Sequence, residues 1–264
     1  MSTRARGSEA PPPEDAASWT GGSLDSLAAW LRAHGVDPAA FASASNDAKS
    51  LSELAREVAR GETTLVGRDV LTNENKKKTR LAQRRVRVLR LLIRDARGRV
   101  LIEAKQEWSD GRVRERGTPL SEKMLRDEDW RDAARRAVLE ELGSCLVKTT
   151  TTDVEDDPDG RIVTLDESSV AFSSIDRTSV SYPGLSCAYE FVTVDAEVRG
   201  LPECDGTFVA ARRKKKKKRK NGDDFFDDEE AGEPSFTSTE RNADGTTLVA
   251  TWVWREGHVV DDGA

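Results

Sequence analysis

The sequence has few of the residues that most zinc and nucleophile sites need. Its 264 residues include only three cysteines and two histidines. Cys145, Cys187 and Cys204 lack the paired spacing of a structural zinc site or a disulfide framework, so they are interpreted as buried free thiols. With only His34 and His258 available, a histidine-based metal site and a Ser-His-Asp triad are both disfavoured.

Long apolar segments are also missing. No apolar run approaches the roughly 20 residues that a membrane helix needs, which predicts a protein without a membrane partner. Residues 1–19 carry acidic residues and a run of prolines in place of the apolar core of a secretory signal. The expected localisation is therefore cytoplasmic or nuclear, with an organelle left open.

The composition allows one core with long solvated stretches. Hydrophobic residues make up 36% of the chain and charged residues 34%. This balance fits a core of about 150 to 200 residues with accessory segments. The predicted organisation is a disordered N-terminus over residues 1–22, a helical accessory segment over 23–75, and one α/β domain over 76–264.

Two helices are predicted in the accessory segment. Ser23 precedes an apolar pattern and is a good N-cap, and Gly35 is the expected end of that helix. Asn46 or Ser50 caps a second helix, which ends at Gly61. The two helices are interpreted as an accessory N-terminal unit.

Strands are predicted after this segment. β-branched residues and leucines crowd residues 86–93, a turn follows at 95–98, and a second strand begins at 100–104. A hairpin is the simplest interpretation. The polar stretch 108–126 is expected to be a loop. Later strand candidates cover residues 161–165, 187–194 and 247–254.

A charge-segregated stretch interrupts the second half of the chain. Residues Arg212–Lys220 are nine consecutive basic residues, and six acidic residues follow within 223–230. Such charge blocks cannot bury a core, so residues 212–233 are predicted to be a disordered insertion. The sharper hypothesis is a nucleic-acid contact or nuclear-import signal through Arg212–Lys220, which the adjoining acids would partly neutralise.

An amphipathic helix is predicted over residues 126–143. Trp130, Ala134, Val138 and Leu142 recur at helical spacing and are expected to face the core. Ala137 is expected at the edge of this stripe. The opposite face is rich in acidic and basic residues.

The two ends of this helix differ in how well they suit its dipole. Asp127 can cap the start and Gly143 the end. Glu140 and Glu141, however, lie near the negative end of the dipole, and a divalent cation is a natural counter-charge. The alternative is a solvated helix stabilised by ion pairs, since Arg136 and Glu140 are four residues apart.

The spacing of these residues resembles the signature of Nudix hydrolases. That signature reads Gly, five residues, Glu, seven residues, Arg-Glu, an aliphatic residue, any residue, Glu-Glu, any residue, Gly, and an aliphatic residue. Glu128 and Arg136 stand in register with its first Glu and its Arg. Glu140, Glu141 and Gly143 match its second half.

The resemblance implies both a fold and a chemistry. It implies a Nudix-like α/β/α sandwich with a mixed sheet, and Mg²⁺- or Mn²⁺-dependent hydrolysis of a nucleoside diphosphate linked to another moiety. The partner would be a nucleotide-like small molecule. By resemblance Glu140 and Glu141 are metal ligands, Glu128 is a further ligand or a support for them, and Arg136 is an orienting ion-pair partner; all four belong to the catalytic set. Lys123 would contact phosphate, with a solvated loop lysine as the alternative.

Three positions depart from the signature. Its opening Gly falls on Glu122, its Glu after Arg falls on Ala137, and its final aliphatic residue falls on Ser144. In the family the carboxylate missing at Ala137 contributes to metal binding or water activation. The second hypothesis is therefore a catalytically degenerate Nudix-like binding or regulatory module. Glu122 and Glu240 are the candidates for a replacement base.

Overall fold

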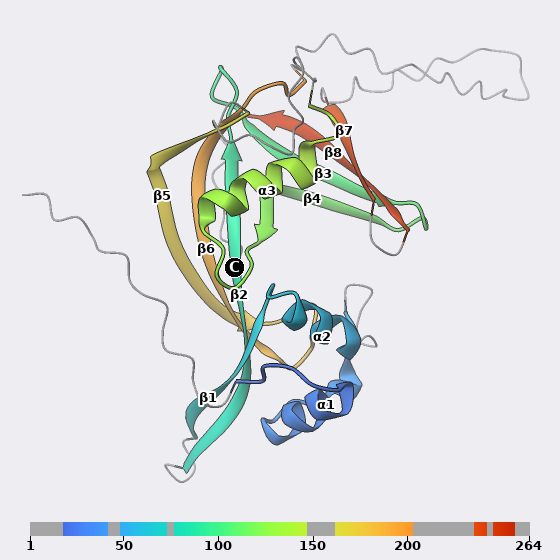
Figure 1. Cartoon of the computed structure of the whole chain (residues 1–264), viewed down its shortest axis with the longest axis vertical. Coiled ribbons are helices and arrows are strands. Elements are labelled where there is room, and N and C mark those ends of the chain that lie inside the picture. Colours follow the sequence, from blue (N-terminus) through green and yellow to red (C-terminus); the bar gives the residue numbers. More distant parts are fainter. Residues whose placement is uncertain are drawn as a thin grey trace, which may run out of the picture. The chain divides into compact units, whose positions relative to one another are not determined.

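The computed structural model describes residues 18–41, 48–72, 77–146, 162–202, 235–241 and 245–256 (Figure 1). Within these residues the chain is mixed α/β, with three α-helices, one short 3₁₀ helix and an eight-stranded sheet. The charged insertion, including Arg212–Lys220, and the first 17 residues lie outside the described part. The chain divides into two compact units, which are considered separately.

The first unit combines the N-terminal helices with a strand pair. It takes in the chain up to Arg87 together with residues 123–127 and 173–190. Strand β2 begins in this unit and continues into the second. The elements that begin the chain are α1 (Leu24–Ala33), η1 (Pro38–Ala40), α2 (Leu51–Ala59), β1 (Thr64–Thr72) and β2 (Lys77–Ile93).

Local capping explains where the two N-terminal helices begin. The Ser23 side chain accepts a hydrogen bond from the backbone N–H of Ser26 at 3.1 Å, which confirms the predicted start of α1. Ser50 and Glu53 form a capping box at the start of α2. The apolar faces of both helices meet one buried cluster, whose members are Trp19, Leu27, Leu31, Val36, Phe41, Leu54, Val58, Leu65, Ala82, Tyr182 and Leu185.

Strand β1 lies within the segment that was expected to be helical. It pairs antiparallel with β2, from Thr64 opposite Arg85 onward. A Cβ atom at Gly67 would stand 2.7 Å from Cδ of Arg80, so the absent side chain leaves room for the arginine stem. The apolar pattern of β1 is too short to predict a strand, because only Leu65 and Val66 are adjacent buried hydrophobic residues before Gly67.

The second unit contains the acidic helix and most of the sheet. Strands β2, β4, β5 and β6 contribute residues to both units, β4 only through its last residue, Lys123. The strand order is β5-β6-β2-β4-β3-β8-β7, with β1 also paired to β2. The remaining elements are β3 (Val100–Trp108), β4 (Val113–Lys123), α3 (Trp130–Leu142), β5 (Val163–Thr178), β6 (Ser186–Val198), β7 (Ser235–Arg241) and β8 (Thr247–Arg255).

Two predictions about this region are wrong. The strands now called β2 and β3 do not form a ladder, because β4 lies between them and only an isolated bridge joins Arg94 to Val100. The polar stretch expected to be a loop contains β4 itself. A tight turn with Gly111 at φ 90° joins β3 to β4, and the first residues of β4 are exposed. An exposed polar strand has no apolar alternation to reveal it.

The three later strand candidates are confirmed as β5, β6 and β8. Strand β7 was not predicted. Across the helices that the structure describes, none has the length and apolar character needed to span a membrane.

Candidate functional site

Helix α3 carries most of the residues that resemble the Nudix signature. It begins at Trp130, and Asp129 is its N-cap, with the carboxylate accepting a hydrogen bond from the backbone N–H of Arg131 at 2.8 Å. The predicted cap, Asp127, lies outside the helix. Gly143 caps the C-terminal end as predicted, and a Cβ there would collide with the carbonyl oxygen of Leu139.

The buried face of α3 differs in two respects from the predicted stripe. Trp130 is only half-buried, and the Arg131 guanidinium lies 4.2 Å from the centre of its ring. Ala137 is fully buried and does not lie at the edge of the stripe. The buried members of the helix are Ala133, Ala134, Ala137, Val138 and Leu142.

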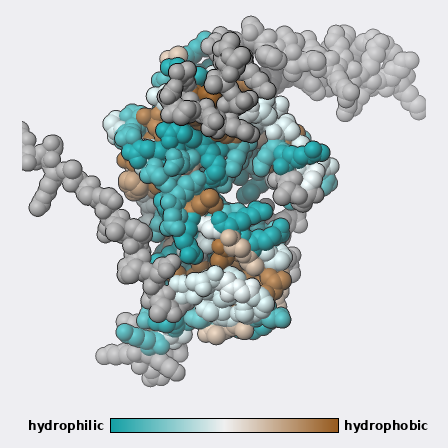
Figure 2. Space-filling model, viewed as in Figure 1, coloured by the Kyte–Doolittle hydropathy of each residue, from teal (hydrophilic) through white to brown (hydrophobic). Residues whose placement is uncertain are grey.

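Arg136 organises one group of carboxylates on the hydrophilic surface over α3 (Figure 2). Its guanidinium donates two hydrogen bonds to Glu128, at 2.8 and 3.0 Å, and one to Glu140 at 2.8 Å. Glu122 lies further from it, at 3.9 Å. The hydrogen bonds to Glu128 and the neighbouring negative charges raise the pKa of Arg136, so it stays charged.

Glu141 belongs to a second group of carboxylates, whose charges act on its pKa. It is partly buried, and burial raises its pKa. The negative charges of Glu103, Glu240 and Glu122 raise it further, against a smaller opposing effect of Arg116, so that the pKa reaches about 8. The positive charge of Arg116 is therefore too weak to compensate this glutamate.

Glu103 is the most deeply buried member of this second group. Only 4% of its surface is exposed, and burial raises the pKa of its carboxyl group. Arg116 lies 2.7 Å from Oε2. Arg116 and a hydrogen bond from the Gln106 side chain both oppose the effect of burial on this pKa without outweighing it.

Strand β7 brings Glu240 to the site. The Ser144 hydroxyl, just after α3, accepts a hydrogen bond from the backbone N–H of Thr239 at 2.7 Å. Ser144 occupies the position of the signature's final aliphatic residue, so this departure has a structural use. Burial raises the pKa of Glu240, and the charge of Glu140 adds to the effect.

Lys123 lies elsewhere. Its ammonium group is 2.7 Å from Oε1 of Glu57 and 3.2 Å from Oε2 of Glu62, both in the first unit. The predicted phosphate contact thus has two carboxylate partners within the protein.

The predicted site residues therefore fall into two groups. Glu128 and Glu140 are paired with Arg136, whereas the charges of Glu103 and Glu240 act on Glu141. The groups overlap at Glu122, which lies 3.9 Å from Arg136 and also acts on Glu141. No three histidine, cysteine, aspartate or glutamate side chains in the described ranges converge closely enough to hold a metal ion. The donor chemistry fits a hard divalent cation, since all the candidate ligands are carboxylates and their charge is uncompensated around Glu141.

Two of these residues escape prediction from the sequence. Glu103 interrupts the apolar run that begins β3 at Val100. Because carboxylates are rare in buried strands, this interruption could have marked Glu103 as a candidate site residue. Arg116 lies in the stretch that was taken for a loop. Only the sheet order brings either one near α3.

Comparisons with protein-family models, with curated proteins and with solved structures find nothing that matches this chain.

Proposed function

We propose that the acidic site binds Mg²⁺ or Mn²⁺ and that the protein hydrolyses a nucleoside diphosphate linked to another group. One observation carries the proposal: Glu141 is partly buried among other carboxylates, with its pKa raised to about 8. Groups with strongly shifted pKa values concentrate at functional sites, and a cation is the simplest source of the missing positive charge.

The residues have distinct tasks in this proposal. Glu141 binds the cation together with Glu128 and Glu140, and Glu103 and Glu240 add negative charge beside it. Arg136 orients Glu128 and Glu140 through the hydrogen bonds it donates to both. A bound divalent cation neutralises diphosphate charge and activates water. The fold proposed for the second unit is a Nudix-like sandwich in which α3 covers one face of the sheet.

A replacement base is needed because position 137 carries no carboxylate. Ala137 and Glu141 are one helical turn apart and share a face of α3. Glu122 and Glu240, the two candidates from the sequence, both act on the pKa of Glu141, as does Glu103. In this proposal one of the three takes the proton of the attacking water.

The second candidate is a binding or regulatory module that has lost turnover. It is favoured by the full burial of Ala137, which leaves this position of the signature without a carboxylate. Such a module would retain cation or nucleotide affinity without hydrolysis.

Calorimetry with Mg²⁺ and Mn²⁺ tests the cation site. Replacing Glu140 and Glu141 together by Gln should abolish binding. Asp132→Asn is the matched control, because Asp132 is an acid on the same helix whose side chain is 72% exposed. If the double variant keeps the affinity of the wild type, the site assignment is wrong.

A substrate panel of nucleoside diphosphate derivatives, assayed with and without Mg²⁺, separates the two functions. Ala137→Glu and Ala137→Gln are compared, since both enlarge the same buried position and only one adds a carboxylate. A higher Mg²⁺-dependent rate in Ala137→Glu supports the hydrolase. Absence of hydrolysis in the wild type and in both variants, with cation binding intact, supports the binding module.

A further inference from the structure

The sheet face that carries Glu103 continues along β3 towards the turn that joins β3 to β4. Trp252 of β8 lies opposite Glu103 of β3. Leu248, which shares the buried face of β8 with Trp252, lies opposite both Trp108 of β3 and Glu240 of β7. Direct partners on neighbouring strands share a face, as do alternate residues of one strand. Glu103, Glu240 and Trp108 therefore lie on one face of the sheet, within the second unit.

Trp108 lies one nucleoside length from the acidic site. Trp108 and Glu240 are both direct partners of Leu248, so two inter-strand spacings, about 10 Å, separate their backbones. This separation is comparable to the length of a nucleoside from its phosphate-bearing end to its base. A diphosphate bound at the acidic site can therefore extend its nucleoside along this row to the ring of Trp108.

The Trp108 side chain is restrained but not covered. It is half-buried, whereas only 1% of Trp252 is exposed. The Arg112 guanidinium lies 5.0 Å from the centre of the Trp108 ring, and Asp110 pairs with Arg112 at 2.8 Å. A restrained aromatic ring that is partly exposed provides a stacking surface for a nucleobase.

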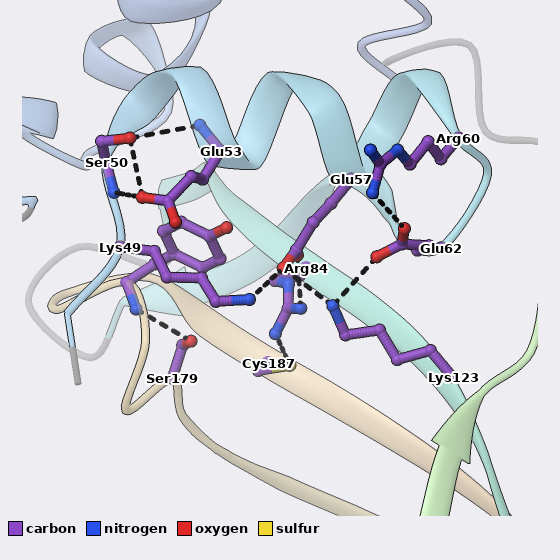
Figure 3. A network of polar contacts seen from close by, with 11 residues as sticks. Lys49, Ser50, Glu53, Glu57, Arg60, Glu62, Arg84, Lys123, Ser179 and Cys187 are labelled. Carbon is purple, nitrogen blue, oxygen red and sulfur yellow. Dashed lines mark hydrogen bonds and ion pairs between the residues drawn. The ribbon is translucent and has the colours of Figure 1, made fainter. Parts of the chain in front are cut away.

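Lys123, the phosphate contact that the sequence predicts, is already paired. Figure 3 shows its ammonium group with Glu57 at 2.7 Å and with Glu62 at 3.2 Å, all within the first unit. Glu57 also pairs with Arg84 and with Lys49, each at 2.7 Å. The charges of this network are thus compensated within the protein. A phosphate at the acidic site needs a different cation.

Arg114 provides a cation on the face that carries Glu103. It lies opposite Gln106 of β3, and Gln106 in turn lies opposite Ala250 on the buried face of β8. The charge of Arg114 is one of the effects that lower the pKa of Glu103, which agrees with this placement. Arg114 is exposed, and its side chain makes no hydrogen bond or ion pair with a residue that the structure describes. It is therefore available to an anion.

We propose that Arg114 and Trp108 form the substrate-binding surface beside the acidic site, where Arg114 pairs with the diphosphate and Trp108 stacks on the nucleobase. This inference rests on the proposed function and narrows its substrate to a diphosphate that carries a base. A guanidinium matches phosphate oxygens with two parallel hydrogen bonds. Stacking accepts every base, so this surface selects nucleotides over other diphosphates without selecting one base.

Binding of adenosine diphosphate and of inorganic pyrophosphate, measured by calorimetry with Mn²⁺ present, separates the two contacts. Trp108→Leu should bind adenosine diphosphate about tenfold more weakly and pyrophosphate as tightly as the wild type. Arg114→Gln should bind both about tenfold more weakly. Trp108→Phe keeps an aromatic ring and should retain most of the affinity for adenosine diphosphate. Equal losses for the two probes in Trp108→Leu would refute stacking.

Trp30→Leu and Arg241→Gln are the matched controls. Trp30 is a half-buried tryptophan of the first unit. Arg241 is an exposed arginine that follows Glu240 on β7 and lies opposite Thr247, so it belongs to the other face of the sheet. Both controls should bind the two probes like the wild type.

Mn²⁺ affinity, measured on every variant, distinguishes failure of this surface from failure of the cation site. Removing the positive charge of Arg114 by itself strengthens Mn²⁺ binding, so weaker binding of adenosine diphosphate in Arg114→Gln is not a loss of metal. Wild-type affinity for adenosine diphosphate in either surface variant, with Mn²⁺ bound, would overturn the inference and leave the proposed function standing.

If the wild type binds no Mn²⁺, the proposed cation site fails, and titration with adenosine diphosphate alone decides on the surface. Weaker binding in Trp108→Leu and Arg114→Gln, but not in the controls, upholds it. Unchanged binding in either variant, or no binding by the wild type, refutes it.

Discussion

Two glutamates on two helices of this protein have opposite surroundings. Glu57 of α2 is buried, and Arg84, Lys123 and Lys49 outweigh the effect of burial and lower its pKa to about 2. Glu141 of α3 is partly buried, but burial and its carboxylate neighbours act together and raise its pKa to about 8. Burial pushes both values in the same direction, so the sign of the shift is decided by the neighbouring charges.

The difference separates a structural site from a candidate functional one. The negative charge of Glu57 is compensated within the protein by Arg84, Lys123 and Lys49. Glu141 has only the weaker influence of Arg116, so its compensation must come from a proton or from a bound cation. The following predictions test this comparison.

The largest effect is expected from Glu57→Gln. The change leaves Arg84 buried without an anionic partner, which should lower the free energy of unfolding by about 3 to 5 kcal/mol. Urea denaturation at neutral pH measures this loss. The double variant Glu57→Leu with Arg84→Met removes both charges and should recover most of the stability. A double variant as unstable as the single one would show that packing, and not charge, explains the effect.

Glu141→Gln should have the opposite sign. Without divalent cations, replacing a carboxylate that faces other carboxylates should raise the free energy of unfolding near pH 8 by about 2 kcal/mol, discounted for partial exposure of the group. Chelator is added so that no cation offsets the repulsion. Destabilisation by this substitution would mean that the carboxylate of Glu141 is already compensated.

The pH dependence gives a second measure of the same variant. The pKa of Glu141 is higher in the folded state than its ordinary value of 4.5, so between pH 4.5 and about 8 the folded state binds more protons. The contribution of Glu141 to the free energy of unfolding is therefore greatest below pH 4.5 and is lost as the pH rises through that window. The gain in Glu141→Gln should therefore vanish near pH 4.5. Glu57 acts in reverse, losing its contribution as the pH falls from 4.5 towards 2.

A smaller effect is expected from Arg136→Lys. Lysine cannot reproduce the two parallel hydrogen bonds to Glu128, whose side chain is 11% exposed, so the loss should be about 1 kcal/mol. Arg135→Lys is the control, because Arg135 pairs with an exposed Asp132 at 3.3 Å and should cost almost nothing. Thermal denaturation of the two variants provides the comparison. Equal losses would contradict a special role for the paired hydrogen bonds.

The smallest effect is expected from Ser144→Ala. Loss of the hydroxyl removes the acceptor for the backbone N–H of Thr239, and water can replace it at this exposed position. The expected cost is about 0.5 kcal/mol. A change in the titration of Glu141, followed by NMR, would show that this hydrogen bond holds Glu240 in place.

The sequence by itself determined the local features of α1, α2 and α3. Ser23, Ser50 and Gly143 cap helices where the pattern predicts, because a cap depends on residues within one turn. Local spacing also places Arg136 one turn before Glu140.

Tertiary structure decided which charges meet. Strand β4 lies between β2 and β3, so the sheet order brings Glu103 and Glu240 to Glu141 from strands far apart in the sequence. The tertiary structure also brings the Lys123 ammonium group to Glu57, which is 66 residues away in the sequence. No local pattern encodes these pairings, because strand order depends on contacts between distant segments. The opposite pKa shifts of the two glutamates follow from those contacts alone.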